Sequence, residues 1–348
     1  MTAKNRDQTL DAIKGVAIFL VMVGHVLNLN HMEDPYVYDG IRAVQMPLFM
    51  MVSGYLCGLG RPVRSLGEYG AIMKRRAISY LVPFFVWIVV LYPLELPGAI
   101  WDTLFHLDYG LWFLMTLFLL TAMVHTAQLA ASLAGERAPL RELLFWAAYG
   151  GMAVFVVAET LVGWEFLSPS LTRMYLPFYL AGYVATAYGR RLSQQSMRQG
   201  QRTAGGWGVS GFWGHLLCNL GALACAGIFF YLLICYDLTD LGSVQAFFRQ
   251  TLASFTGCYL IFWLCRRWPS GRTKQAFAWL GGYTLEIYAL HFHFATLLNQ
   301  GQAYGLYSLQ GLLFAGASFV AMSLITAGII AVTKKVPLLD FLLYGKGK

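Results

Sequence analysis

Long, continuous apolar segments recur along this sequence, and they limit the folds open to it more than any other feature. Each is about 20 residues long, the length that an α-helix needs to cross the hydrocarbon core of a bilayer. Backbone N–H and C=O groups inside a bilayer must be satisfied within the protein, so only helices and closed barrels span it. Barrel strands would alternate polar and apolar residues, and these segments do not. The sequence therefore predicts an all-α, polytopic bundle of membrane helices.

Composition supports this prediction, because only 12% of the residues are charged, whereas soluble domains carry about 25%. The first apolar segment contains charged residues and lacks a cleavage site, so we expect it to be retained as a helix. We expect one membrane-embedded domain over residues 1–348, without a soluble C-terminal domain, and a mobile loop over residues 189–212. We predict about ten transmembrane helices, at residues 10–29, 41–59, 77–95, 110–131, 142–162, 172–188, 213–235, 247–265, 276–298 and 308–333.

The distribution of charge gives this bundle an orientation. If the N-terminus is cytoplasmic, the inner segments hold all of the 25 Lys and Arg residues except Lys14, Arg42, Arg173 and Arg249. The predicted outer loops carry acidic residues instead. Cytoplasmic loops are enriched in Lys and Arg, so we predict that both termini lie in the cytoplasm. This bias also accounts for the net charge of +8, and no nucleic-acid partner is needed to explain it.

Ionisable residues within the first predicted helix point to a site, because such residues are costly in a membrane. Lys14 and His25 are eleven positions apart, so they share one helix face roughly 16 Å apart along the axis. Asp11 lies one turn before Lys14 and can pair with it. Lys14 could instead be a lysine that extends to the membrane boundary, and His25 could bond between helices.

The predicted helix at 276–298 supplies partners for His25. Glu286 falls near the middle of the membrane, and His291 falls about fifteen residues into its helix, the same depth as His25. Both helices run in the same direction, so the two histidines should lie at similar depth. The three side chains therefore suggest a polar chamber in the outer half of the bundle.

Other segments allow both a structural and a functional interpretation. Ser53 belongs to a small-residue pair that would let helices pack closely. The basic run at residues 74–76 could reflect topology alone, or it could bind a polyphosphate. Tyr109 and Trp112 could belong to an interfacial aromatic belt, or they could stack on a sugar.

Several of these motifs together resemble the membrane acyltransferase-3 family of bacterial O-acyltransferases. The segment Arg6–His25 is similar to the family's first-helix signature, and Met46–Leu56 to its second-helix motif. Lys74–Pro83, Leu111–Leu114 and Leu280–His291 also fit, in the expected order. Within the family, the chain looks most like the branch related to fucose 4-O-acetylases.

The resemblance implies transfer of an acetyl group from cytoplasmic acetyl-CoA to a carbohydrate hydroxyl of a cell-surface or exported glycan. It places the chain in the inner (plasma) membrane as a multi-pass protein, with acetyl-CoA as a substrate and no bound cofactor or metal. His25 would be the general base or an acyl-carrying nucleophile. Glu286 and His291 would orient groups or assist proton transfer.

The same resemblance gives roles to the remaining candidates. Lys14, Arg75 and Arg76 would hold the phosphates or pantetheine of CoA, while Ser53, Tyr109 and Trp112 would line the acceptor chamber. Some relatives carry an extracytoplasmic domain, which a separate partner could supply here. Two other interpretations are open from the residues: a transporter or flippase for a glycan or small metabolite, and a membrane sensor or scaffold whose buried charges set helix registry.

Overall fold

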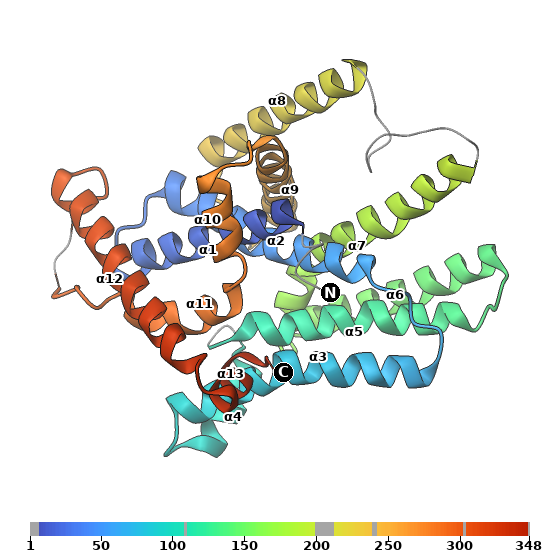
Figure 1. Cartoon of the computed structure of the whole chain (residues 1–348), viewed down its shortest axis with the longest axis horizontal. Helices are drawn as coiled ribbons and strands as arrows, with labels where there is room; N and C mark the ends of the chain where they lie inside the picture. The colour runs from blue at the N-terminus through green and yellow to red at the C-terminus, as the bar shows by residue number, and fades with distance from the viewer. Residues whose placement is uncertain (1–6, 108–109, 199–211, 239–241, 302–303, 347–348) are drawn as a thin grey trace. The chain divides into compact units, whose positions relative to one another are not determined.

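A computed structural model describes residues 7–107, 110–198, 212–238, 242–301 and 304–346, and every regular element in these residues is helical. The long helices are α1 (Gln8–Leu29), α2 (Pro35–Leu59), α3 (Leu66–Leu91), α5 (Trp112–Ser132), α6 (Ala138–Leu161), α7 (Pro169–Arg198), α8 (Phe212–Cys235), α9 (Val244–Arg267) and α12 (Leu309–Thr333) (Figure 1). Shorter elements are α4 (Leu96–Phe105), α10 (Arg272–Leu280), α11 (Thr284–Leu290), the 3₁₀ turn η2 (His291–Phe294) and α13 (Pro337–Tyr344). The all-helical prediction is confirmed for the described residues.

The predicted continuous helix at 276–298 was wrong. The chain there forms α10, α11 and η2, and the first break falls at Gly281 and Gly282. A Cβ at Gly281 would lie 1.9 Å from the backbone oxygen of Asp11. The break is therefore associated with a close backbone approach to α1, which only glycine permits.

The predicted loop at 189–212 also needs correction at its start. Helix α7 continues to Arg198, well beyond the predicted end at residue 188. The rest of that loop, residues 199–211, lies outside the described residues. Two short helices that the sequence did not predict, α4 and α13, complete the fold.

The chain divides into two compact units, and each is described by itself. The first comprises Met1–Val52 and Tyr188–Ala331, and the second comprises Ser53–Ala187 and Val332–Lys348. In the first unit α1 packs against α10, and α8 against α9; in the second, α5 packs against both α3 and α6. Figure 1 shows α3 and α5 side by side.

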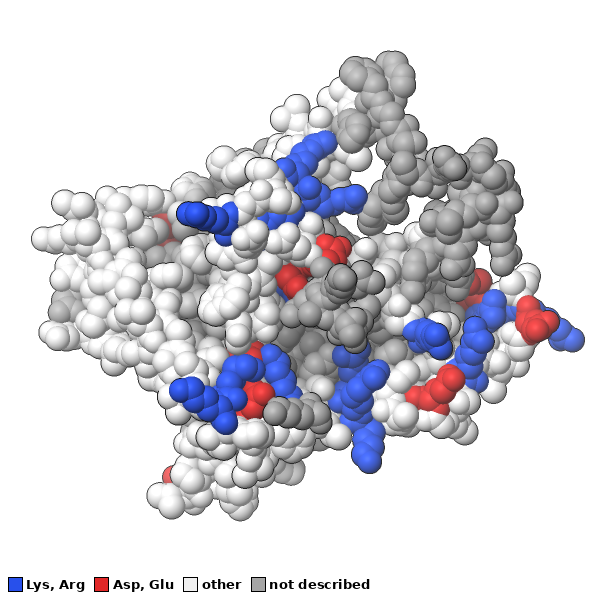
Figure 2. All heavy atoms as spheres, viewed as in Figure 1, with Lys and Arg blue, Asp and Glu red and all other residues white. Residues whose placement is uncertain are grey.

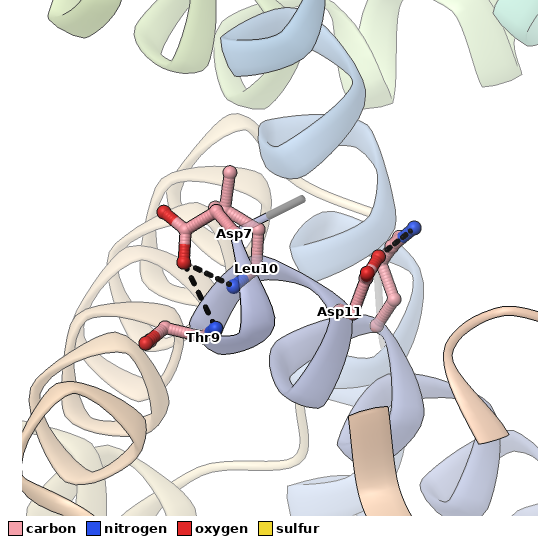
Figure 3. Close-up of polar contacts among 5 residues, drawn as sticks. Asp7, Thr9, Leu10 and Asp11 are labelled. Carbon is pink, nitrogen blue, oxygen red and sulfur yellow. Dashed lines mark hydrogen bonds and ion pairs between the residues drawn. The ribbon is translucent and has the colours of Figure 1, made fainter. Parts of the chain in front are cut away.

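The first unit is organised around α1. Asp7 caps this helix by accepting hydrogen bonds from the backbone N–H groups of Thr9 and Leu10 (Figure 3). A Cβ at Gly15 would lie 1.9 Å from the backbone oxygen of Phe277, so α1 and α10 cross with their backbones in contact. Small residues allow such close crossings in membrane proteins, and this crossing positions α11 beside α1.

The second unit uses the same device. A Cβ at Gly54 would lie 1.9 Å from the backbone oxygen of Tyr179, so the backbones of α2 and α7 are in contact. The small-residue pair Ser53 and Gly54 thus allows the close helix packing that the sequence predicted. The short helix α13 packs on α3, where the indole N–H of Trp87 donates to the backbone oxygen of Leu343. The contact with α13 therefore helps to hold α3, the helix that carries both Arg75 and Arg76.

The surface fits a membrane environment. Within the described residues, five helices are long and apolar enough to cross a bilayer, namely α1, α5, α6, α12 and residues 216–235 of α8. Only 11% of the most apolar stretch of α6 is buried inside the protein, and only 22% of the corresponding stretches of α8 and α12. On the face in Figure 2, most described atoms belong to uncharged residues, and the charged side chains form separate groups. The chain is thus a helical membrane protein, while the ten spans and their orientation stay predictions.

Candidate functional site

His25 and His291 meet in the first unit. Their ring centroids lie 5.1 Å apart, and the ring of Phe292 stands edge-on to His25 at 5.2 Å. His25 comes from the C-terminal half of α1, and His291 begins the turn η2 directly after α11. The structure therefore brings together the two histidines that their equal depth in the sequence predicted to be neighbours.

The hydrogen bonding of His291 determines which of its nitrogens can act as a base. Its Nδ1 lies 2.7 Å from the backbone oxygen of Ile287. A carbonyl oxygen only accepts, so Nδ1 carries the proton and Nε2 carries a lone pair. That Nε2 is buried and has no hydrogen-bond partner among the described residues. A buried acceptor without a partner is uncommon, and here it belongs to a group that can take up a proton.

Two further buried polar residues lie on the segments that carry the pair. Glu286 is fully buried on α11, one turn and a half before His291. Asn30, which the sequence analysis did not single out, is 1% exposed at the end of α1. Its amide donates to the backbone oxygens of Val26 at 2.7 Å and Ala295 at 2.9 Å. Asn30 thus ties the end of α1 to the chain directly after η2, and so fixes the segment that carries His291.

Lys14 lies at the other end of α1. Its ammonium nitrogen is 2.7 Å from a carboxylate oxygen of Asp11, as their spacing predicted (Figure 3). Both side chains are largely buried, at 19% and 11% exposure. A buried cation of this kind is paired in most proteins, so the pair explains how Lys14 is accommodated. Its proposed role toward CoA remains a prediction.

The basic run belongs to the second unit, on α3. Arg75 is exposed, whereas Arg76 is half-buried and donates from Nη1 to the hydroxyl of Tyr80 at 3.2 Å. The Nε of Arg76 is buried and has no hydrogen-bond partner among the described residues. A guanidinium with an unused donor can bind a phosphate or carbonyl oxygen.

The three predicted chamber residues have different surroundings. Ser53 is half-buried on α2, beside the close contact of Gly54 with α7. Trp112 stacks on Tyr175, with ring centroids 5.4 Å apart and an interplanar angle of 21°. Tyr109 lies outside the described residues.

Sequence reasoning missed a second histidine cluster. In the second unit, Nδ1 of His125 lies 3.0 Å from Oε1 of Gln128, and its Nε2 lies 3.8 Å from the sulfur of Cys57. Gln128 also accepts from the N–H of Val63 and donates to the hydroxyl of Tyr183. The only sequence signal was the presence of His125 and Gln128 in an apolar segment. The cluster is satisfied internally, and we interpret it as a network that joins helices.

The site that remains is a pair of histidines, with a buried carboxyl group, that of Glu286, five residues before His291 in the chain. Among the described residues, no group of three or more His, Cys, Asp or Glu side chains could hold a metal ion. A neutral imidazole with a free lone pair is suited to taking a proton from a hydroxyl group near neutral pH. The arrangement can therefore perform general-base chemistry in a site shielded from bulk water.

Comparison with known proteins identifies the family. Residues 7–332 match the family described as acyltransferase domain. The chain belongs to this family. The match covers nearly all of the described chain, including both histidines, Glu286 and the basic run, and it confirms the family predicted from the motifs.

Two curated relatives match a shorter part of this acyltransferase domain. Nodulation protein NolL of Sinorhizobium fredii is 38% identical over 92 residues, which are 24% of this chain and 24% of that protein. Nodulation protein NolL of Mesorhizobium japonicum is 34% identical over 98 residues, 26% of this chain and 25% of the relative. The chain thus matches about a quarter of the length of each relative. No solved structure matches the chain.

Proposed function

We propose that this protein is a membrane O-acetyltransferase that moves an acetyl group from cytoplasmic acetyl-CoA to a hydroxyl group of an exported or cell-surface glycan. The observation that carries the proposal is the close pair of half-buried His25 and buried His291 in a chain of the acyltransferase family. The proposed location is the inner (plasma) membrane, with both termini in the cytoplasm. Transport, the alternative left open by the sequence, is not favoured by any feature of the site.

The proposed reaction needs a base. A sugar hydroxyl is a weak nucleophile until its proton is removed during attack. In the proposed step its oxygen attacks the acetyl carbonyl carbon, and a C–O bond forms as the C–S bond to CoA breaks. His25 takes the hydroxyl proton, and the CoA sulfur leaves as a thiolate, which takes up this proton from the histidine pair. The lone pair on Nε2 of His291 can receive that proton from His25 or bind an acceptor hydroxyl.

The proposed donor site uses cations near the cytoplasmic ends of the helices. Arg75 and Arg76 would bind CoA phosphates, since guanidinium groups form paired hydrogen bonds with phosphate oxygens. Lys14 would line the donor path. Ser53, Tyr109 and Trp112 would contact the acceptor, and a separate extracytoplasmic partner could assist it.

The test separates chemistry from donor binding. Protein in nanodiscs is supplied with radiolabelled acetyl-CoA and free fucose, and sugar acetylation is measured. We expect His25→Ala to lower transfer by about 10²–10⁴-fold and to leave acetyl-CoA binding by calorimetry unchanged. The exposed His106 provides the control variant His106→Ala, which should retain full activity.

Donor binding is tested with matched pairs of arginines. Arg75→Ala with Arg76→Ala should weaken acetyl-CoA binding, while Arg137→Ala with Arg141→Ala, which removes two exposed arginines, should not. If His25 carries the acetyl group, labelled acetyl-CoA will acetylate the protein in the absence of sugar. Full activity of correctly inserted His25→Ala would refute the role of His25, and no acetyl-CoA binding by folded protein would refute the proposed function.

A further inference from the structure

A cavity of about 590 Å³ opens in the first unit, the one that holds His25 and His291. One wall comes from residues 33–42, which include the loop before α2 and the first turns of that helix. The other comes from residues 233–237 at the end of α8. This volume lies within the range of small-molecule sites. The proposed function assigns nothing to this cavity.

The walls combine aromatic rings with oxygen acceptors. Tyr36, Tyr38 and Tyr236 line the cavity, and Tyr36 is 52% exposed. Aromatic rings offer flat apolar faces, which suit the C–H faces of a sugar ring. Carboxylates accept hydrogen bonds from hydroxyl groups, and four of them share the cavity: Glu33, Asp34, Asp39 and Asp237.

The cavity carries an excess of negative charge, because Arg42 is the one basic residue among the described residues that line it. Hydrogen bonds from the backbone N–H of Val37 lower the pKa of Asp34, which keeps this group ionised. Burial, and then repulsion by Asp237, raises the pKa of Asp39. An anionic ligand would meet this same repulsion, whereas an uncharged or cationic one would not.

These carboxylates are arranged for an extended ligand rather than for an ion. Three of them lie along the first wall and Asp237 lies on the second, and no group of three or more acidic, His or Cys side chains among the described residues could hold a metal. A ligand with several hydroxyl groups can use acceptors that are spread in this way. Together with the tyrosine rings, they fit a carbohydrate.

The cavity is also close to the histidines along the chain. His25 lies four residues before the end of α1, or about 6 Å along the helix axis. Glu33 and Asp34 follow a few residues later, and Asn30 ties the intervening turn to Ala295, directly after η2. The cavity and the histidine pair therefore belong to one unit and are joined by a short, tethered stretch of chain.

We propose that this cavity is the subsite for the sugar units next to the acetylated one, and that it accepts uncharged or amino sugars and excludes acidic sugars. The proposal rests on the proposed function for its place in the reaction. Binding of sugar to the cavity, however, requires no acetyl transfer. The two can therefore fail separately.

The test is calorimetric titration of the protein in nanodiscs, without acetyl-CoA, with fucosyllactose, free fucose and the acidic trisaccharide sialyllactose. Fucosyllactose should bind at least tenfold more tightly than sialyllactose. Tyr36→Ala should weaken fucosyllactose binding about tenfold and leave free fucose unaffected. Glu33→Lys, a charge reversal of an exposed residue, should reduce the discrimination against sialyllactose. The control is Trp164→Ala, which removes an exposed aromatic ring of the other unit.

Kinetics add a second readout. If acetyl transfer occurs, Tyr36→Ala should raise KM for fucosyllactose and leave kcat, and both constants for fucose, unchanged. Equal binding of the two trisaccharides, no binding of fucosyllactose, or equal effects of Tyr36→Ala and Trp164→Ala would overturn the proposal. Binding that depends on Tyr36 in a protein without transferase activity would support the subsite and refute the proposed function.

Discussion

The backbone of α1 at Gly15 touches the backbone of α10 at Phe277, where a Cβ would lie 1.9 Å from the carbonyl oxygen. No rotamer change can relieve a clash between a Cβ and a backbone atom, so any side chain at Gly15 must push the two helices apart. Because α10 leads directly into α11 and η2, this contact also positions Glu286 and His291.

Gly15→Ala should therefore reduce both stability and activity. Overpacking of this kind typically costs about 1–3 kcal/mol, and separation of the helices would move His291 away from His25. The measurements are thermal unfolding in detergent and acetyl transfer. Gly316→Ala on α12 is the matched control, because no atom lies within 4 Å of its added Cβ. Equal unfolding temperatures for the two variants would contradict the prediction.

The sequence predicted several relationships because they depend on spacing within a helix or on depth in the membrane. The pair of Asp11 and Lys14 follows from a separation of three residues, which places both on one helix face. The proximity of His25 and His291 was inferred from equal depth in two predicted helices, and the rings do meet although the second of these helices is divided into α10, α11 and η2. The length of the continuous apolar segments likewise predicted the long helices.

What could not be predicted depends on how each helix is rotated against its neighbours. Helix α5 is apolar all round, so its sequence does not indicate which face His125 presents, and its contact with Cys57, 68 positions earlier, could not be inferred. The break at Gly281 was equally hidden, since glycine is common in membrane helices. Only the contact with α1 shows why the helix ends there.

Asn30→Ala should loosen the segment that carries His291. The variant leaves the backbone oxygen of Ala295 without its donor in a buried site, which costs about 1–3 kcal/mol. We expect a lower unfolding temperature and a fall in acetyl transfer. Asn299→Ala, which removes only a hydrogen bond to the N–H of Gly301 in an exposed turn, is the control. An Asn30 variant with unchanged kinetics would show that η2 is held by other contacts.

The raised pKa of Asp39 predicts that the stability of the folded protein depends on pH. Its pKa is raised in the folded protein, first by burial and then by Asp237, so the ionised form is less favourable there than in the unfolded chain. The sign follows from linkage: protonation relieves this cost, and the contribution of Asp39 becomes less destabilising as the pH falls. Asp39→Asn should therefore unfold at a higher temperature than the wild type at pH 7. The difference should shrink as the pH falls toward about 3.9, the ordinary pKa of an aspartate in an unfolded chain, and should disappear below it. A difference that stays constant with pH would contradict this origin.

The network around Gln128 predicts graded losses of stability. Oε1 of Gln128 accepts from Val63, so Nδ1 of His125 must be the donor to this oxygen, and the lone pair of its Nε2 faces Cys57. Gln128→Leu keeps a similar volume but removes the acceptor of two buried donors, which should cost about 1–3 kcal/mol for each group left unsatisfied. Tyr183→Phe removes a single hydrogen bond to Gln128 and should lower the unfolding temperature by less. Since we assign the network a role in joining helices and none in the reaction, both variants should keep kcat when assayed well below their unfolding temperatures. A loss of kcat in correctly folded Gln128→Leu, with acetyl-CoA binding intact, would instead place His125 in the chemistry.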